Sequence, residues 1–205
     1  MDISNLHENL NFIFHDSLDE LVYESDFELL VKLILSPRAN ENIVNKIGNL
    51  LVSKFPNIKD LYNANLTSIE KIVRPIGYYH QKSLRLKSAS DLIISKFEGH
   101  IPKKYSDLIQ IPGIGDKCAK KYLSLINKAH FIIIDAHLIR VLTRLDLISS
   151  DFSHTQIENF IKSNLKNTNY TDFSNLLNLF GKRLCKSRKP QCIKCPFKNF
   201  CNFIN

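Results

Sequence analysis

The spacing of apolar residues predicts helices along almost the whole chain. In eight stretches the apolar side chains recur every three or four positions, which is the spacing of one face of an α-helix. The stretches are Leu10 to Leu21, Phe27 to Leu35, Ile43 to Phe55, Leu84 to Phe97, Tyr122 to Ile126, Leu138 to Leu147, Ile157 to Leu165 and Phe173 to Leu184. The apolar run Phe131 to Ile134 would also suit a short buried strand, and we favour an extended segment that leads into the next helix. The pattern therefore predicts an all-α fold.

Residues that typically begin, end or interrupt helices lie between these stretches or, in the case of Gly48, within one of them. Thr67 and Glu70 have the spacing of a capping box at a helix start. Prolines and glycines mark further interruptions, helix ends or turns. The prolines are Pro56, Pro75, Pro102 and Pro112, and the glycines are Gly48, Gly77 and Gly99.

Composition and charge narrow the class of protein. The chain has 205 residues, of which 44% are hydrophobic, and this is enough for one domain or two small ones with a substantial core. No apolar run approaches the ~20 residues that cross a bilayer, and the N-terminal sequence MDISNLHENL lacks the features of a secretory signal. We therefore expect an intracellular protein that does not bind a membrane. The net charge of +8 and the pI of about 9.2 favour a polyanionic partner.

Four cysteines near the C-terminus form the most specific chemical pattern. Cys185, Cys192, Cys195 and Cys201 have the spacing C-x6-C-x2-C-x5-C, which fits neither a helix face nor a strand. Zinc sites with four cysteines usually have two short hooks, and only Cys192 and Cys195 form one here. A pair of disulfides does not suit a reducing interior. We expect the set to hold a [4Fe-4S] cluster, with zinc as the alternative, and Cys118 to be a spare thiol.

Basic residues gather around these cysteines and form what we call the basic collar. After Asp172 the chain has no acidic residue, whereas lysine and arginine accumulate. The collar consists of Lys182, Arg183, Lys186, Arg188, Lys189, Lys194 and Lys198. Cationic side chains on a loop held by a metal centre would meet phosphates without first having to be ordered. A lysine-rich surface that only contacts water is the alternative.

A glycine-rich turn joins two predicted helices in the middle of the chain. Within residues 108–123, the sequence Pro112-Gly113-Ile114-Gly115 separates a short helix from the next one. Glycine lets a backbone turn sharply and approach a partner closely. The free N–H groups at the start of the second helix would then bind an anion such as a DNA phosphate. Such a turn is common, so the surrounding residues decide its meaning.

These surrounding residues resemble the endonuclease III family of DNA glycosylases, and the resemblance covers nearly the entire chain. Four sequence blocks carry it together with the cysteine spacing, and their order and separations are jointly specific. The blocks are Ser25-Asp-Phe-Glu-Leu-Leu30 leading to Leu35-Ser36, Gly77-Tyr-Tyr-His-Gln-Lys82, Ile111-Pro-Gly-Ile-Gly-Asp-Lys117 and Ile134-Asp-Ala-His-Leu-Ile-Arg140.

The resemblance implies two helical lobes that flank a DNA cleft. A six-helix barrel with a helix-hairpin-helix motif would span residues 22–130, and an iron–sulfur cluster lobe would combine residues 1–21 with 131–205. The four cysteines would hold the [4Fe-4S] cluster. We expect a monomer that binds double-stranded DNA containing damaged bases or abasic sites, in the cytoplasm or nucleoid of a prokaryote.

The resemblance also implies a catalytic pair, Lys117 and Asp135, facing each other across the cleft. A base must leave the duplex stack before it can be excised. The Lys117 amine would attack C1′ of the sugar and give a Schiff base, which permits β-elimination of the 3′ phosphate. Asp135 would stabilise positive charge on the sugar, help to deprotonate the amine and cap a helix. We expect the Lys117 amine to be partly buried near a helix N-terminus, which would favour its uncharged form.

Further residues are expected to contact DNA. Two turn glycines would let the backbone approach a phosphate, a histidine is a candidate DNA or hydrogen-bond contact, and three collar residues would bind phosphates. These residues are Gly113, Gly115, His137, Lys186, Arg188 and Lys189.

Two positions depart from the family pattern where substrate choice is made. Arg38 stands where the family usually has a glutamine, and Tyr78 stands where it usually has an aliphatic residue. Arg38 would donate to a purine edge and Tyr78 would stack on an orphaned base, unless both are neutral surface exchanges. We expect the reaction to be excision of damaged, oxidised pyrimidines with strand nicking. The alternatives are a mismatch glycosylase that removes uracil or thymine opposite guanine, and a noncatalytic DNA-binding protein.

Overall fold

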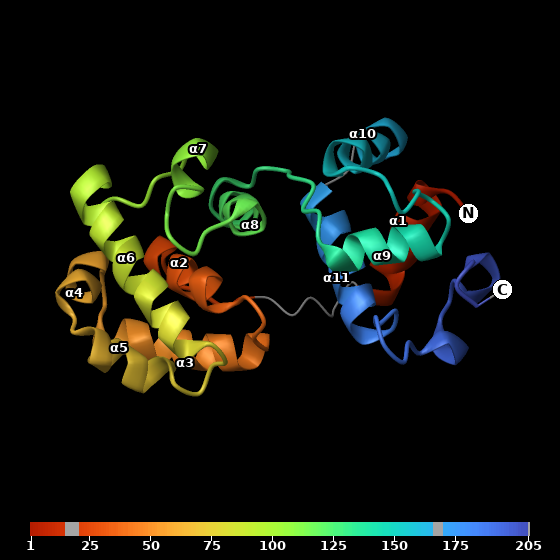
Figure 1. Ribbon diagram of the computed structural model, residues 1–205. Coiled ribbons are helices and arrows are strands. Elements are labelled where there is room, and N and C mark those ends of the chain that lie inside the picture. Colours follow the sequence, from red (N-terminus) through yellow and green to blue (C-terminus); the bar gives the residue numbers. More distant parts are fainter. Residues whose placement is uncertain (15–20, 166–169, 205) are drawn as a thin grey trace. The chain divides into compact units, whose positions relative to one another are not determined.

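The computed structural model describes residues 1–14, 21–165 and 170–204. This part of the chain consists of helices and loops without a β-strand, so the all-α prediction is confirmed for it. The helices pack into two compact units, one of residues 20–129 and one of residues 1–19 and 130–205 (Figure 1). No helix in the described ranges is long and apolar enough to cross a membrane.

A buried central helix organises the unit of residues 20–129. The unit contains α2 (Asp26–Leu35), α3 (Glu41–Lys54), α4 (Ile58–Asn63), α5 (Leu66–Val73), α6 (Tyr79–Phe97), α7 (Tyr105–Leu108) and α8 (Asp116–Asn127). Every residue of α2 after the first is buried, and this helix packs against α3, α6 and α8 (Figure 1). A helix that is buried on all sides needs neighbours around it, and α6 in turn is covered by α4 and α5.

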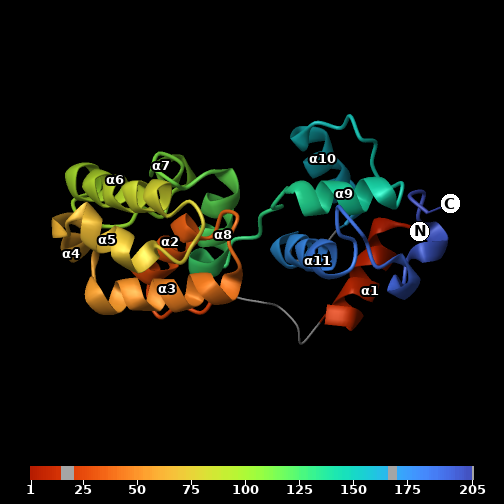
Figure 2. The same ribbon diagram turned by 60° about the horizontal axis from the view of Figure 1, so that its bottom comes forward.

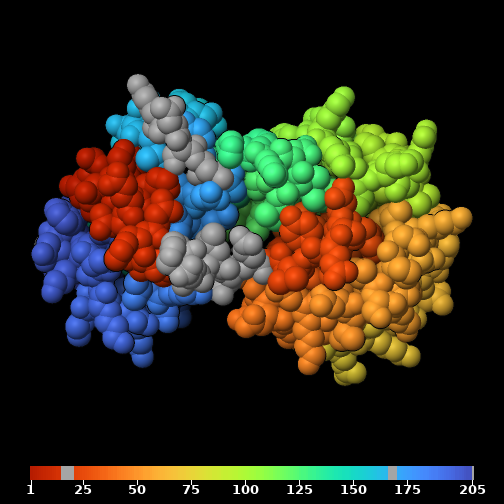
Figure 3. Space-filling view, turned by 180° about the vertical axis from the view of Figure 1, so that it is seen from behind, coloured from red at the N-terminus to blue at the C-terminus, as the bar shows by residue number. Residues whose placement is uncertain are grey.

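The other unit combines both ends of the chain. It contains α1 (Ile3–Phe14), α9 (Ala136–Arg144), α10 (His154–Asn164) and α11 (Tyr170–Arg183), followed by the 3-10 turns Cys192–Lys194 and Lys198–Phe200. Helix α11 packs against α1 and α9, and α10 contacts α1 (Figure 2). The space-filling view shows α1, in red, directly against the blue C-terminal residues (Figure 3). Leu6, Leu138 and Phe173 are fully buried in the core that these helices share.

The structure corrects several predicted helix boundaries. Helix α1 begins at Ile3 instead of Leu10, and residues 15–20 of that predicted helix lie outside the described residues. Helix α4 lies where no helix is predicted. The capping box at Thr67 is wrong, because the extended residue before α5 is Asn65 and Thr67 is already helical. Glu70 is close to His80 instead, with 2.9 Å between Oε1 and Nδ1. Residues 131–134 form no strand, so the extended lead-in is confirmed.

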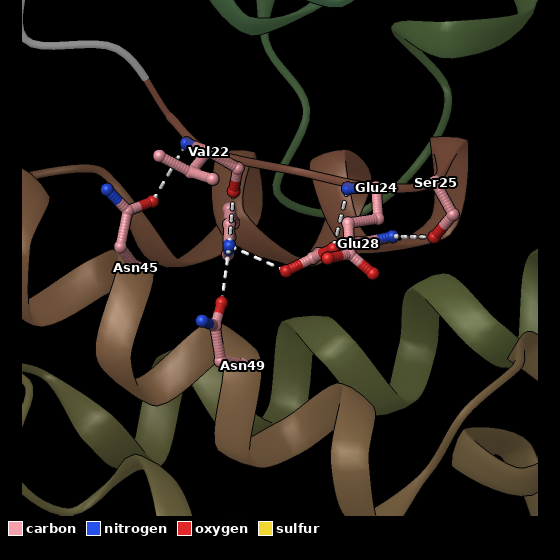
Figure 4. Close-up of polar contacts among 7 residues, drawn as sticks. Val22, Glu24, Ser25, Glu28, Asn45 and Asn49 are labelled. Atoms are coloured by element: carbon pink, nitrogen blue, oxygen red, sulfur yellow. Dashed lines mark hydrogen bonds and ion pairs between the residues drawn. The ribbon is translucent and has the colours of Figure 1, made fainter.

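Gly48 lies in the middle of α3, so the prediction that it lies near a helix end or turn is wrong. The position needs a residue without a side chain, because a buried lysine passes over it. A Cβ on Gly48 would lie 2.6 Å from both Cγ and Cε of Lys32. Lys32 is fully buried, and its Nζ donates to Glu28 Oε1 (2.7 Å), to Asn49 Oδ1 (2.6 Å) and to the Val22 carbonyl (Figure 4). A buried charge is tolerated only with such partners, so this network fixes how α2 packs on α3.

We expect Gly48→Ala to lower the free energy of unfolding by about 1–3 kcal/mol, the usual cost of overpacking a core. Alanine would gain up to about 1 kcal/mol in helix propensity, but its methyl group would push the Lys32 stem away from its three acceptors. Denaturant unfolding measures the change. Gly77→Ala is the matched control, since no atom of the described residues lies within 4 Å of a Cβ there. Equal stability of Gly48→Ala and the wild type would contradict the packing argument.

Candidate active site and metal centre

The turn between α7 and α8 is a tight hairpin anchored by apolar side chains. Ile111 and Ile114 are buried beneath it, and the Ile114 N–H donates to the Ile111 carbonyl (2.9 Å). Gly113 has φ +93°, and a Cβ there would lie 3.1 Å from Ile34 Cγ2, so only glycine fits without strain. Gly115 has an ordinary φ of −96°, and apart from Gly115 and its two chain neighbours no atom of the described residues lies within 4 Å of a Cβ there. Gly115 therefore leaves room for an outside partner to approach the backbone.

Lys117 lies in the first turn of α8. Gly115 is the N-cap of this helix and, being glycine, has no side chain to accept from the first amides, so this helix end suits an anion. The Lys117 side chain is exposed, and the predicted partial burial is wrong. The reason is helical geometry: α8 buries the face that carries Ala119, Tyr122 and Leu123, and Lys117 points away from that face.

A phenol and a carboxylate brace the hairpin. The Tyr105 hydroxyl donates to Asp116 Oδ1 (2.7 Å), and Lys120 Nζ lies 3.1 Å from the same oxygen. The hydrogen bond to Asp116 raises the pKa of Tyr105 above its usual value. Because Tyr105 is on α7 and Asp116 is the first residue of α8, this contact ties the two helices of the hairpin together.

Asp135 is the N-cap of α9 and is held through both carboxylate oxygens. Its Oδ1 accepts from the amides of His137 and Leu138, each at 2.9 Å, so the predicted capping role is confirmed. Its Oδ2 accepts from the side-chain amide of Asn178 on α11. Asn178 could not be predicted from the sequence, because it is one polar residue among many on a predicted helix and lies 43 positions from Asp135.

Hydrogen bonds to α11 also fix the extended segment that leads to Asp135. The buried backbone N–H groups of this segment would cost free energy if they had no hydrogen-bond acceptors. The Phe131 N–H donates to Thr171 Oγ1 (2.9 Å), and the Ile133 N–H donates to Ser174 Oγ (3.0 Å). Thr171 and Ser174 are themselves buried. The Asp135 backbone is therefore positioned before α9 begins.

His137 is half-buried, and its Nδ1 lies 3.0 Å from Arg140 Nη2. Arg140 also donates to the carbonyls of Gly181 and Cys185, both at 2.9 Å. A Cβ on Gly181 would lie 2.8 Å from His137 Cβ, so α9 and α11 approach closely at this glycine. His137 thus has the predicted hydrogen-bond contact within the protein.

The four cysteines of the predicted metal set line one cavity. Its walls are formed by Cys185, Cys192, Cys195 and Cys201 together with Arg144, Leu184, Pro190, Gln191, Phe203 and Ile204. All five cysteines of the chain are free thiols. Burial raises the pKa of the Cys195 thiol, and the nearby Cys185, Cys201 and Cys192 raise it further. A cationic centre would reverse this effect and favour the thiolates.

The lining of the cysteine cavity provides four sulfur donors for a metal centre. A single tetrahedral zinc ion, with Zn–S bonds of about 2.3 Å, would draw its four sulfur atoms to within about 3.8 Å of one another. Within the described residues no three histidine, cysteine or carboxylate side chains converge closely enough for one metal ion. The fit therefore rests on the shared cavity and on four sulfur donors, the set that iron–sulfur clusters use.

Arg144, at the end of α9, clamps the cysteine loop. Its Nη1 donates to the Cys185 Sγ (3.4 Å) and to the Lys186 carbonyl (2.8 Å), and its Nη2 donates to the Ser187 carbonyl (3.3 Å). Its guanidinium carbon also lies 3.8 Å from the centre of the Phe203 ring. Sequence reasoning missed this residue, although its spacing of four from Arg140 places both arginines on one face of the predicted helix.

The predicted phosphate contacts of the basic collar lie at the surface of this loop. Lys186, Arg188 and Lys189 are all exposed. Lys189 has φ +50°, a strained value for a residue with a side chain. Because Arg144 fixes the carbonyls of Lys186 and Ser187, this part of the collar is carried on an ordered backbone.

Arg38 and Tyr78, the two departures from the family pattern, are neighbours in the structure. The Arg38 guanidinium lies over the Tyr78 ring at 5.4 Å, and its Nη1 donates to the Tyr78 hydroxyl (3.2 Å). Both side chains are exposed. The sequence separates them by 40 positions and did not indicate this contact.

Comparisons with known proteins agree with this arrangement. The family model described as HhH-GPD superfamily base excision DNA repair protein matches residues 31–167. Endonuclease III of Rickettsia conorii is 29% identical over 184 residues, which cover 90% of this chain and 87% of the relative. Endonuclease III of Bacillus subtilis is 28% identical over 182 residues, which cover 89% of this chain and 83% of the relative.

A solved structure has a similar fold. It is described as a trapped endonuclease III–DNA covalent intermediate in an estranged-adenine complex, and it matches with a TM-score of 0.89 and 28% identity over 98% of this chain and 94% of that chain. The resemblance to the endonuclease III family is therefore confirmed. Because the family model spans about two thirds of its length, the chain belongs to the HhH-GPD superfamily of base excision DNA repair proteins.

Proposed function

We propose that the protein is a base-excision-repair DNA glycosylase with AP lyase activity on oxidised pyrimidines in double-stranded DNA. The observation that carries the proposal is the exposed Lys117 amine in the first turn of α8, at a helix end capped by glycine. A phosphate bound at this helix end would bring a sugar close to the amine. The two curated relatives are named endonuclease III, and an endonuclease III has been trapped as a covalent intermediate with DNA.

Lys117 supplies the nucleophile in this proposal. Its uncharged amine attacks C1′ of the extruded nucleotide, the bond between C1′ and the base breaks, and the base leaves with a proton. The nitrogen then loses a proton and expels the ring oxygen O4′ from C1′, O4′ takes up a proton, and C1′ and the nitrogen are left as a Schiff base, which makes the C2′ proton acidic. Loss of that proton breaks the C3′–oxygen bond and releases the 3′ phosphate, and water finally hydrolyses the Schiff base.

Asp135 supplies the negative charge that this reaction needs. Positive charge develops on the sugar as the base leaves, and a carboxylate held in place before the reaction stabilises it without reorganisation. The three donors described above fix the Asp135 carboxylate. The same group is proposed to accept the proton that Lys117 must lose before it attacks.

We propose that Cys185, Cys192, Cys195 and Cys201 hold a [4Fe-4S] cluster through their thiolates. The shared cavity and the sulfur donors support this assignment. When bound, the cluster links the ends of the cysteine loop and stabilises it. Arg144 would balance part of the negative charge at Cys185 through its N–H···S contact.

The partner in this proposal is double-stranded DNA that contains a damaged base or an abasic site, bound by a monomer inside the cell. Phosphates are contacted by the hairpin backbone and by the exposed side chains of the basic collar. His137, near the start of α9, is proposed as a further contact. The contacts carried over from the sequence are Gly113, Gly115, His137, Lys186, Arg188 and Lys189.

Substitutions of Lys117 and Asp135 distinguish the role of the amine from the role of the carboxylate. We expect the wild type to excise thymine glycol faster than mispaired thymine and to be trapped by borohydride on abasic DNA. Lys117→Gln should bind abasic DNA but give no trapped adduct. Asp135→Asn keeps a good capping residue but loses the charge, so base excision should fall at least about 100-fold with little change in stability.

Single-turnover excision, borohydride trapping and thermal unfolding measure these effects. Lys121→Gln is the matched control, because it removes a lysine from the same helix without touching the first turn. Efficient trapping of Lys117→Gln would move the nucleophile to another residue. Faster excision of mispaired thymine than of thymine glycol would favour the mismatch glycosylase.

The second prediction concerns the metal. Protein purified without oxygen should contain iron and acid-labile sulfide and should absorb broadly in the visible range. Cys192→Ser should contain no iron, unfold more easily and bind DNA more weakly, because the metal centre no longer closes the loop. Cys118→Ser is the matched control, since this thiol is outside the cavity. Stoichiometric zinc without iron would overturn the cluster assignment.

A further inference from the structure

Arg144 contacts the chain at both ends of the cysteine loop. At the first cysteine, its guanidinium donates to the Cys185 Sγ (3.4 Å) and to the carbonyls of the two residues that follow. After the last cysteine, its backbone carbonyl accepts from the Asn202 N–H (2.9 Å), and its guanidinium carbon lies 3.8 Å from the centre of the Phe203 ring. One residue of α9 therefore ties the beginning and the end of this loop together.

Phe203 and Ile204 form part of the wall between the cysteine cavity and the solvent. Both side chains line the cavity, yet Phe203 is 53% exposed and Ile204 is 43% exposed. A side chain that has one part on a cavity and another part in water separates the two. The Ile204 N–H donates to the Cys201 carbonyl (3.4 Å), so a turn folds this segment back onto the last cysteine, which is itself buried.

Burial alone does not hold the Phe203 ring in this wall, because more than half of the side chain is in water. A guanidinium is planar, so it can donate from its edge while an aromatic ring lies against its face. Arg144 uses both properties: its N–H groups donate to the cysteine loop, and its guanidinium lies over the Phe203 ring. The position of the ring therefore depends on Arg144.

An apolar wall matters at a metal site because it controls how water and small solutes reach the metal. A solute that binds the metal competes with the thiolates for it. We propose that Phe203, held in place by Arg144, covers the metal centre at the four cysteines and slows the exchange of metal with the solvent. This inference rests on the proposed metal centre and does not depend on the glycosylase reaction.

Release of metal to a chelator tests the cover. Protein purified without oxygen is diluted into excess EDTA, and the metal that stays bound is followed over time by elemental analysis. We expect Phe203→Ala to start with the metal content of the wild type and to lose it at least about tenfold faster, as changes around a metal site commonly do. Phe203→Tyr keeps the ring and should release metal at the wild-type rate.

A double variant tests whether Arg144 acts through the ring. Arg144→Met should release metal faster than the wild type, because the ring is no longer held. Adding Phe203→Ala to Arg144→Met should then change the rate little, since two residues that act as one unit do not give additive effects. Additive effects on the logarithm of the rate would overturn the coupling of the two residues.

Phe200→Ala is the matched control, because Phe200 is 52% exposed on the same loop and does not line the cavity. It should release metal at the wild-type rate, and thermal unfolding should show the same Tm for Phe203→Ala and Phe200→Ala. The inference is overturned by equal release from Phe203→Ala and the wild type, or by faster release that only accompanies a lower Tm. Bound zinc in place of iron would count against the proposed cluster alone, since the same release rates then test the cover. Wild-type protein without any bound metal would overturn both.

Discussion

One short helix, α9, connects the proposed catalytic carboxylate to the cysteine loop. Asp135 caps its first turn, and Arg140 and Arg144 in its last two turns donate to Cys185, Lys186 and Ser187. The helix has nine residues and packs against α11, so one short element joins the carboxylate to the loop. The position of the carboxylate and the order of the loop therefore depend on the same few contacts.

This connection explains what a metal centre at the four cysteines contributes. Burial first, and then the three neighbouring cysteines on the same cavity, raise the pKa of Cys195, so this thiol is costly to ionise. A cationic centre and the Arg144 guanidinium both relieve that cost, and both act on the segment that carries the collar residues. In the proposed function the centre would be a structural element that holds cationic side chains where phosphates would bind, and no catalytic step would have to pass through it.

The sequence predicted the elements with local or covalent signatures and missed the contacts between distant residues. The all-α fold, the hairpin at Gly113, the cysteine set and the Asp135 cap all follow from short-range spacing. The Asn178 contact and the Arg38–Tyr78 pair join residues about 40 positions apart, which no periodic pattern records. The expected partial burial of Lys117 is wrong because α8 buries the face that carries Ala119, Tyr122 and Leu123, and Lys117 lies on another face.

Lys117 is the proposed nucleophile, and a second lysine of the chain is a chemical rival for this role. Lys82 is 2% exposed, and burial together with the nearby Arg85 lowers its pKa, which favours the uncharged amine. The direct measurement is mass-spectrometric mapping of the lysine that borohydride joins to an abasic duplex. We expect the adduct on Lys117, whose side chain is exposed. An adduct on Lys82, or on any other amine in place of Lys117, would contradict it.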